Sequence, residues 1–239
     1  MNTNVNLDAA LGVLAFLGTG FCLLLMGAIF LHALIVHKRN RAGKVLLMAL
    51  IGVGLYAGLL LAFSFISGEK ALAQNEEKHF CEIDCHLAYS VTNVERTKTI
   101  GSGANQATAN GVFYVVTLKT RFDEKTISSQ RGTEQLTPNS RVASITDEKG
   151  RRSAPSPEGT RALELSGEAG TPFTTALRPG ESYTTRLAFD LPVETKDAQL
   201  LINEGELVTH FIIGHENSFL HKKTEFRLEP QTERTARFN

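Results

Sequence analysis

Two cysteines and a histidine lie close together in the segment EKHFCEIDCHLAYSV, residues 77–91. Cys81 and Cys85 are four residues apart, and His86 directly follows the second cysteine. Thiolates and an imidazole at such spacing can form a disulfide, hold a soft metal ion or resemble a haem attachment site. Which chemistry applies depends on how the chain folds around them and on the redox compartment that they occupy.

A disulfide between Cys81 and Cys85 is the simplest interpretation, because neighbouring cysteines outside the cytoplasm normally pair. In an extended strand the two residues would lie about 13 Å apart. A disulfide needs Cα atoms within about 7 Å of each other. The bond is therefore expected only if CEIDC turns, which Asp84 favours, and so small a loop would add little stability.

A copper or zinc site is the alternative, since thiolate and imidazole are good ligands for both metals. The candidate ligands are Cys81, Cys85, His86, His210, His215 and His221. The first and late strands of a β-sandwich can be neighbours, which would bring the two groups together. Each late histidine also fits as an ordinary strand or loop residue, so a chain without a cofactor is the simpler expectation.

Two known redox motifs fit less well. Covalent haem attachment uses Cys-x-x-Cys-His, which is one residue shorter than the spacing here. The chain also resembles, in outline, the copper subunit of terminal oxidases, with two helices and an external β-domain. Three of that family's copper ligands are replaced, by Ile83, Tyr89 and Thr92. The resemblance is one of architecture, which does not imply function.

Two long apolar segments without a charge precede these residues, at 9–36 and 45–66. Each reaches the roughly 20 residues that a membrane-spanning helix needs and is apolar on all sides. The sequence therefore predicts two transmembrane helices. Small residues let helices approach closely, and such residues support a packed hairpin and a homodimer. They are Gly18, Gly20, Gly27, Gly52, Gly54 and Gly58.

The connection at 37–44 carries Lys38, Arg39, Arg41 and Lys44, whereas residues 1–8 contain no lysine or arginine. The positive-inside rule places this loop in the cytoplasm. The N-terminus and everything after the second helix are then extracytoplasmic. The sequence ALAQ at 71–74 resembles a signal-peptidase site, which leaves open a release of the domain near Ala73.

After a polar linker at 68–79, short runs alternate apolar and polar residues, which is typical of β-strands. The clearest runs are HLAYSVTNV, GVFYVVTLKTRF, SYTTRLAFDLP, ELVTHFIIG and TEFRL. Several short strands with turns between them predict an antiparallel β-sandwich over 80–228. The sequence SAPSPEG is expected to be a surface loop, and 229–239 a flexible tail.

One segment also resembles a known family. LRPGESYTTRLAFDLP contains the turn Pro179-Gly180 and a strand that ends in Phe189-x-x-Pro192. In this it is similar to the immunoglobulin-like, telokin-like family of bacterial extracytoplasmic domains, over roughly 80–228. The resemblance implies an immunoglobulin-like β-sandwich on a bacterial membrane anchor and supplies no catalytic residues. The cysteine–histidine cluster and the helical hairpin depart from the plainer members of that family.

The composition excludes some functions. With 25 basic and 25 acidic residues the chain has no net charge, and no basic stripe points to nucleic acid. No nucleophile elbow, phosphate loop or paired-histidine zinc motif is present. The sequence therefore predicts a non-enzymatic membrane protein whose external loops bind an envelope protein or ligand. A copper- or zinc-binding envelope protein using Cys81, Cys85 and His86 is the alternative.

Overall fold

The computed structural model describes residues 2–82 and 85–229, with the side chains of Glu82 and Cys85 outside the described part. It divides into two compact units. The described residues of Met1–Asn4, Glu69–Gly205 and Thr224–Asn239 form a β unit. A helical unit consists of Val5–Gly68 and Glu206–Lys223. A late segment of the sequence therefore belongs with the two N-terminal helices.

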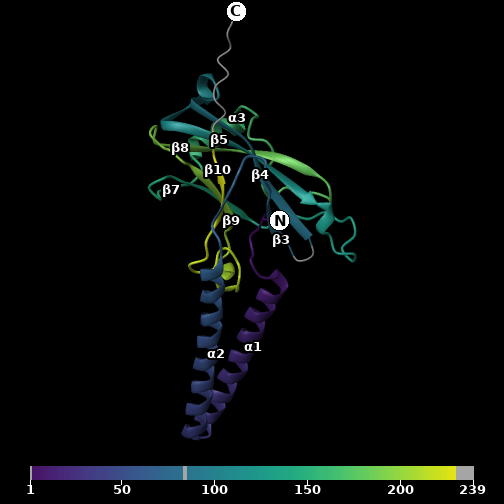
Figure 1. Cartoon of the computed structure of the whole chain (residues 1–239), viewed down its shortest axis with the longest axis vertical. Helices are drawn as coiled ribbons and strands as arrows, with labels where there is room; N and C mark the ends of the chain where they lie inside the picture. The colour runs from purple at the N-terminus through teal and green to yellow at the C-terminus, as the bar shows by residue number, and fades with distance from the viewer. Residues whose placement is uncertain (1, 83–84, 230–239) are drawn as a thin grey trace, which may run out of the picture. The chain divides into compact units, whose positions relative to one another are not determined.

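The helical unit contains α1 (Ala9–Ile35) and α2 (Arg39–Ile66), which lie antiparallel and in contact (Figure 1). Asp8 caps α1, since its side chain accepts a hydrogen bond from the Ala10 N–H at 3.0 Å. Both helices are long and apolar enough to cross a membrane, as predicted. The helix α2 begins at Arg39, so Arg41 and Lys44 lie in its first turns and not in a loop.

The six glycines of the predicted hairpin do not bring α1 and α2 together. A Cβ atom added at any of them would meet nothing within 4 Å. A homodimer through these glycines stays a prediction. By contrast, a Cβ at Gly12 would lie 2.7 Å from the Ile213 carbonyl oxygen. The close approach in this unit is therefore between α1 and the late segment.

Within the described residues, the β unit contains two five-stranded sheets. The first has the order β1 (Asn2–Thr3), β3 (Lys78–Glu82), β4 (Cys85–Ile100), β5 (Ala107–Asp123) and β8 (Ser182–Leu191). The second has the order β2 (Lys70–Leu72), β10 (Thr224–Arg227), β9 (Gln199–Glu204), β6 (Arg141–Thr146) and β7 (Arg152–Ser153). Short 3-10 helices are η1 (Gly103–Asn105) and η2 (Glu124–Thr126).

The sheets are mixed, which corrects the expectation of a wholly antiparallel sandwich. The pairs β1–β3 and β2–β10 are parallel. Both strands β1 and β2 are very short and flank the helices in sequence, so they carry no alternation by which they could be recognised. The predicted linker at 68–79 contains β2 and the start of β3, and is therefore part of the sheets.

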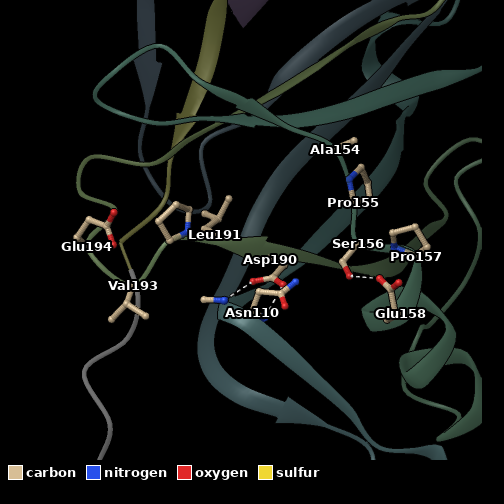
Figure 2. Close-up of a pocket in the computed structure, with 12 residues that line it drawn as sticks. Asn110, Ala154, Pro155, Ser156, Pro157, Glu158, Asp190, Leu191, Val193 and Glu194 are labelled. Carbon is tan, nitrogen blue, oxygen red and sulfur yellow. Dashed lines mark hydrogen bonds between the residues drawn. The ribbon is translucent and has the colours of Figure 1, made fainter.

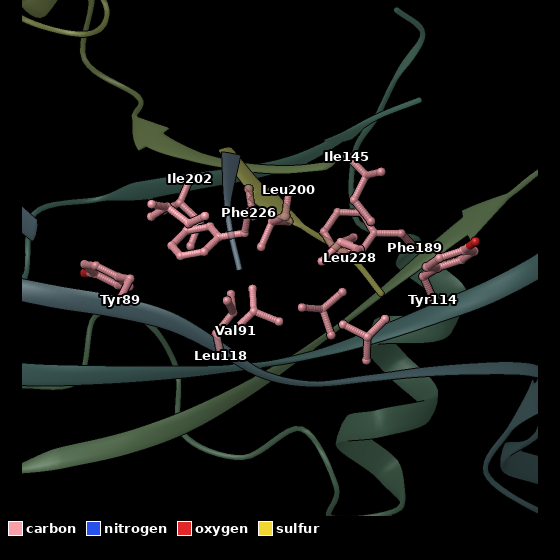
Figure 3. Packing of buried hydrophobic residues seen from close by; sticks show 14 of the residues in the cluster. Tyr89, Val91, Tyr114, Leu118, Ile145, Phe189, Leu200, Ile202, Phe226 and Leu228 are labelled. Carbon is pink, nitrogen blue, oxygen red and sulfur yellow. The ribbon is translucent and has the colours of Figure 1, made fainter. Parts of the chain in front are cut away.

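One hydrophobic core lies between the two sheets, and Figure 3 shows its packing. The first sheet contributes alternate residues of its strands, among them Tyr89, Val91, Leu118 and Phe189. The second contributes Ile145, Leu200, Ile202 and Phe226. All eight side chains are buried. The period-two pattern of the sequence therefore predicts this core correctly along β4, β5 and β8.

The helix α3 (Pro157–Leu165) covers the other face of the first sheet, where Ala162 and Leu163 pack with Phe113. Its start corrects the expectation that SAPSPEG is only a surface loop. The Ser156 Oγ accepts a hydrogen bond from the Gly159 N–H at 3.2 Å, and Pro157 takes the first helical position. Serine followed by proline is a helix-start signal that the sequence does contain.

The segment ELVTHFIIG is not a strand, contrary to prediction. It forms the 3-10 helix η3 (Leu207–Phe211) and a following turn, both in the helical unit. Its hydrogen bonds are local, such as that from the Thr209 hydroxyl to the Glu206 carbonyl at 2.6 Å. Apart from Glu229, the predicted tail at 229–239 lies outside the described residues.

Candidate functional site

The segment that contains Cys81, Cys85 and His86 forms a β-hairpin of β3 and β4. In the register of β3 and β4, Cys81 lies opposite His86 and Glu82 lies opposite Cys85. Directly opposed residues of an antiparallel pair share a face of the sheet. The Cys81 Sγ accordingly lies 3.0 Å from the His86 Nε2. The hairpin register thus builds a thiol–imidazole pair from two of the predicted site residues.

The predicted disulfide between Cys81 and Cys85 has no support in the described residues, which contain no disulfide. The chain does reverse direction between the two cysteines, as such a bond requires. However, Cys81 has His86 as its cross-strand neighbour, and the side chain of Cys85 lies outside the described part. The disulfide therefore stays a prediction.

A network of charged side chains continues from this pair. The His79 Nε2 lies 3.4 Å from the Asp123 Oδ2 and 3.6 Å from the Glu77 Oε2. Arg121 donates two hydrogen bonds of 2.8 Å to Glu77 and one of 3.2 Å to Asp123. The rings of His79 and His86 are 6.2 Å apart at their centroids. Side chains from β3, β4 and β5 thereby form one polar cluster with Glu77, which directly precedes β3.

The surroundings set the charge states of this cluster. Burial lowers the pKa of His86, and the neighbouring His79 lowers it further. The hydrogen bonds from Arg121 lower the pKa of Glu77. Burial by itself raises the pKa of Asp123, but hydrogen bonds from the Lys125 N–H and from Arg121 leave that pKa below its ordinary value. At neutral pH the site therefore combines a neutral imidazole with two carboxylates.

As a metal site the cluster is incomplete. The described residues contain no group of three or more histidine, cysteine and carboxylate side chains placed to hold a metal ion. Cys81 and His86 supply two donors, whereas the His79 Nε2 faces carboxylates. The Nδ1 atoms of His79 and His86 are buried and have no hydrogen-bond partner in the described part of the chain. A metal would therefore need a further ligand.

The three late histidines belong to the helical unit and have local partners there. The His210 Nδ1 lies 3.2 Å from the Leu207 carbonyl oxygen. The His215 Nδ1 accepts a hydrogen bond from the Asn217 N–H at 3.0 Å. His221 is 2.7 Å from the Lys222 carbonyl through its Nδ1. Over the ranges that the structure describes, only Cys81 and His86 of the predicted ligands are brought together.

A pocket of about 830 Å³ opens elsewhere on the β unit and is drawn in Figure 2. Residues 110–111, 154–158 and 190–194 line it, which are the start of β5, the approach to α3 and the end of β8. This volume falls within the range of small-molecule and peptide sites, about 300–1,000 Å³. Three segments that are distant in the sequence form the pocket, so no single sequence motif predicts it.

Two local interactions hold the pocket's shape. The Asp190 carboxylate accepts hydrogen bonds from the backbone N–H groups of Asn110 at 2.7 Å and Gly111 at 2.9 Å. A Cβ at Gly111 would lie 1.9 Å from the Leu191 carbonyl oxygen, so this approach of β5 to β8 requires glycine. On the other wall, the Ser156 hydroxyl lies 3.3 Å from the Glu158 carboxylate (Figure 2).

The lining is acidic and rich in proline. Glu158, Asp190 and Glu194 are its charged residues, and the lining that is described contains no lysine or arginine. Pro155, Pro157 and Pro192 form rigid apolar parts of the wall. Such a surface fits a ligand with a positive charge beside an apolar group.

Comparison with known proteins leaves the family open. No family model matches the chain, and no curated protein matches it. The secreted protein MPT63 from Mycobacterium tuberculosis is similar in structure, with a TM-score of 0.41 and 11% identity over 68% of this chain and 97% of that chain. A conserved hypothetical protein from Bacillus anthracis gives 0.39 and 14% over 56% and 92%. Similarity at this level supports no conclusion on family or function.

Proposed function

We propose that this protein is a bacterial membrane-anchored binding module. Its immunoglobulin-like β unit would bind a basic segment of another envelope protein in the acidic pocket. The observation that carries the proposal is the lining of that pocket, where three segments converge to present Glu158, Asp190 and Glu194, and none of the described lining residues is basic. The Lys98 ammonium group lies next to this lining, where it donates hydrogen bonds to the carbonyls of Asn110 at 3.2 Å and Gly111 at 2.9 Å. Recognition by loops at the edge of a rigid sheet is common in β-domains.

The two helices support the anchoring part of the proposal. Their large apolar side chains are mostly exposed, for example Leu24 at 74% and Leu55 at 67%. Apolar surface of this extent is rare on water-soluble proteins and normal against lipid. Lys38, Arg39, Arg41 and Lys44 lie at the connection and the first turns of α2, which supports a cytoplasmic location for that end. The β unit is then extracytoplasmic.

The pocket's chemistry defines the ligand more closely. A lysine or arginine would pair with Glu158 or Glu194, while its aliphatic stem or a neighbouring apolar residue would lie on the prolines. Such exposed ion pairs contribute little individually, about 0–1 kcal/mol each. Binding should therefore need several contacts and should weaken as salt increases.

The test uses the full chain in lipid nanodiscs and a labelled lysine- and proline-containing peptide. We expect measurable binding that weakens with salt and falls several-fold in a Glu158→Gln/Glu194→Gln variant. Glu164→Gln is the matched control, because Glu164 is exposed on the same helix but outside the pocket. Equal binding by all three proteins, or preference for an acidic peptide, would contradict the proposal.

Copper or zinc binding at the β3–β4 hairpin is a second candidate, favoured by the 3.0 Å contact between the Cys81 Sγ and the His86 Nε2. Intact mass with and without reduction, together with elemental analysis, distinguishes a metal site from a disulfide at this hairpin. A metal protein should hold near-stoichiometric metal that is lost in Cys81→Ser and kept in Cys22→Ser. A mass gain of two hydrogens on reduction, without metal, would instead support the disulfide.

A further inference from the structure

The segment 206–223 exposes most of its large apolar side chains and buries several of its polar ones. Leu207 is 75% exposed, Phe219 51% and Leu220 67%, and Val208 and Phe211 are also exposed. The buried side chains include Thr209, Asn217 and Ser218. A loop in water shows the opposite arrangement. The exposed apolar side chains of this segment therefore need a partner other than water.

The middle of the segment lies beside the bodies of the two helices. The Tyr56 hydroxyl donates a hydrogen bond of 2.5 Å to the Phe211 carbonyl. Tyr56 is ten residues before the end of α2 at Ile66, which corresponds to about 15 Å along a helix axis. On α1, the Gly12 backbone lies against the Ile213 carbonyl. Phe211 and Ile213 are thus alongside the helices, within their length.

The segment then returns to the end of α2. The Lys222 N–H donates a hydrogen bond of 2.9 Å to the hydroxyl of Ser67, the residue that follows α2. Lys222 is exposed, and Lys223 follows it. Lysines at the end of an apolar stretch commonly extend their ammonium groups into the lipid headgroup region. The segment 206–223 therefore runs beside the helices and returns to the level at which α2 ends.

The backbone of the segment is suited to a place with little water. The Ile212 carbonyl accepts hydrogen bonds from the Ser218 hydroxyl at 2.5 Å and from the His215 N–H at 3.2 Å. The Thr209 hydroxyl is shared, since it donates to Glu206 and accepts from the Asn217 side-chain amide at 3.0 Å. In lipid, unsatisfied backbone groups cost several kcal/mol each. Here, side chains of the same segment and Tyr56 supply partners.

We propose that the apolar side chains of Leu207–Leu220 insert into the outer leaflet of the bilayer that α1 and α2 span. This inference rests on the proposed membrane anchoring. Its occupant is lipid, because the exposed apolar surface of the segment adjoins that of the helices, where Leu11 and Leu14 are exposed near Gly12. The rings of Phe211 and Phe219 pack edge to face at 5.7 Å and form part of the inserted surface.

The experiment uses the absence of tryptophan from the chain. Single variants Phe211→Trp and Phe219→Trp report on the segment, and Val208→Trp is a third reporter should either fail to fold. Leu24→Trp reports on the helix, and Val142→Trp, on an exposed side chain of β6, is the aqueous control. Each full-length protein is placed in phosphatidylcholine vesicles with and without brominated acyl chains, which quench tryptophan by contact.

We expect the segment tryptophans to emit at shorter wavelength than Val142→Trp and to lose most of their emission in brominated vesicles. Lipid brominated near the headgroup should quench them best, and lipid brominated deep in the chain should quench Leu24→Trp best. If only Leu24→Trp is quenched, the anchor stands and the inserted segment is disproved. If Leu24→Trp is not quenched, membrane anchoring itself fails. A blue-shifted but unquenched segment would mean that protein covers it, which also overturns the proposal.

Discussion

The β unit and the helical unit treat the same residue types in opposite ways. Phe226 of β10 is fully buried between the sheets, whereas Phe219 of the helical unit is half exposed. Leu200 is buried, whereas Leu24 and Leu207 are among the most exposed of the large apolar side chains that the structure describes. This difference is the one expected if water surrounds the β unit and lipid surrounds the helical unit. The β unit excludes water from an apolar core, while the helical unit turns its apolar surface outward.

The strongest test of this comparison is a matched pair of phenylalanine truncations. Phe226→Ala should lower the free energy of unfolding of the β unit by about 3–5 kcal/mol, because it leaves a cavity in a close-packed core. Phe219→Ala should change that quantity by less than about 0.5 kcal/mol. Chemical unfolding in detergent, followed by the tyrosine signal, measures both. Similar costs would contradict the division into two solvents.

A buried lysine sharpens the comparison, because it is a polar side chain inside the unit that excludes water. Lys78 is fully buried and donates to the carbonyls of Ile202 at 2.8 Å and Thr224 at 2.9 Å. Lys78→Met keeps the aliphatic stem but removes both hydrogen bonds, which should cost about 2–4 kcal/mol. Lys119→Met, on β5, is the control and should be close to neutral. An equally stable Lys78→Met protein would show that these bonds do not hold the strands together.

A smaller effect is expected where α3 begins. Ser156→Ala removes the hydroxyl that accepts the Gly159 N–H and should cost about 1 kcal/mol. It should also weaken peptide binding, since Ser156 lines the pocket. Thermal unfolding and peptide titration measure the two effects. Loss of stability with unchanged binding would separate the helix start from the pocket.

The smallest effect concerns pH and the cluster at the β3–β4 hairpin. The folded-state pKa values of Glu77, Asp123 and His86 are all lowered. Each group then binds more protons in the unfolded state, so stability rises with pH. The contribution of His86 is complete above about pH 6.5 and is lost on acidification through its lower folded pKa. The carboxylates lose theirs at lower pH still.

Urea unfolding between pH 7 and pH 3 tests this expectation. The stability should fall over that range, and His86→Asn should remove the upper part of the fall, while Asp123→Asn should remove part of the lower. Lys125→Met is the control for a changed charge. Lys125 lies next to the cluster, but its side chain is not in an ion pair with Asp123. Stability that rises on acidification would contradict the assignment.

The predictability of each region follows from how local its signal is. Tyr89, Leu118 and Phe189 could be placed in the core from alternation alone, and the two apolar helices from their length. The same alternation gives a wrong prediction for ELVTHFIIG. There, Leu207 and Phe211 are exposed apolar side chains of a 3-10 helix and do not belong to a sheet. An apolar period in the sequence indicates which side chains avoid water, but it does not indicate whether protein or lipid surrounds them.

The candidate site is only partly local. Cys81 and His86 face each other across one hairpin, so the register of β3 with β4 is enough to place them in contact. Arg121 and Asp123 join them only through the long register of β4 with β5. The pocket depends further on the pairing of β5 with β8 and on the short helix α3. The prolines at the start of α3 had led to the prediction of a loop there.

The strands that join the two units have a mechanical consequence. β1 leads into α1 and β2 leads out of α2, and each is the outermost strand of a different sheet. The segment 206–223 also lies in the helical unit and joins the end of β9 to the start of β10. A force between the two units would therefore be shared among β1, β2, β9 and β10. Because β9 and β10 lie inside the second sheet, each with a neighbouring strand on both sides, they keep the two units joined even if the edge strands β1 and β2 detach.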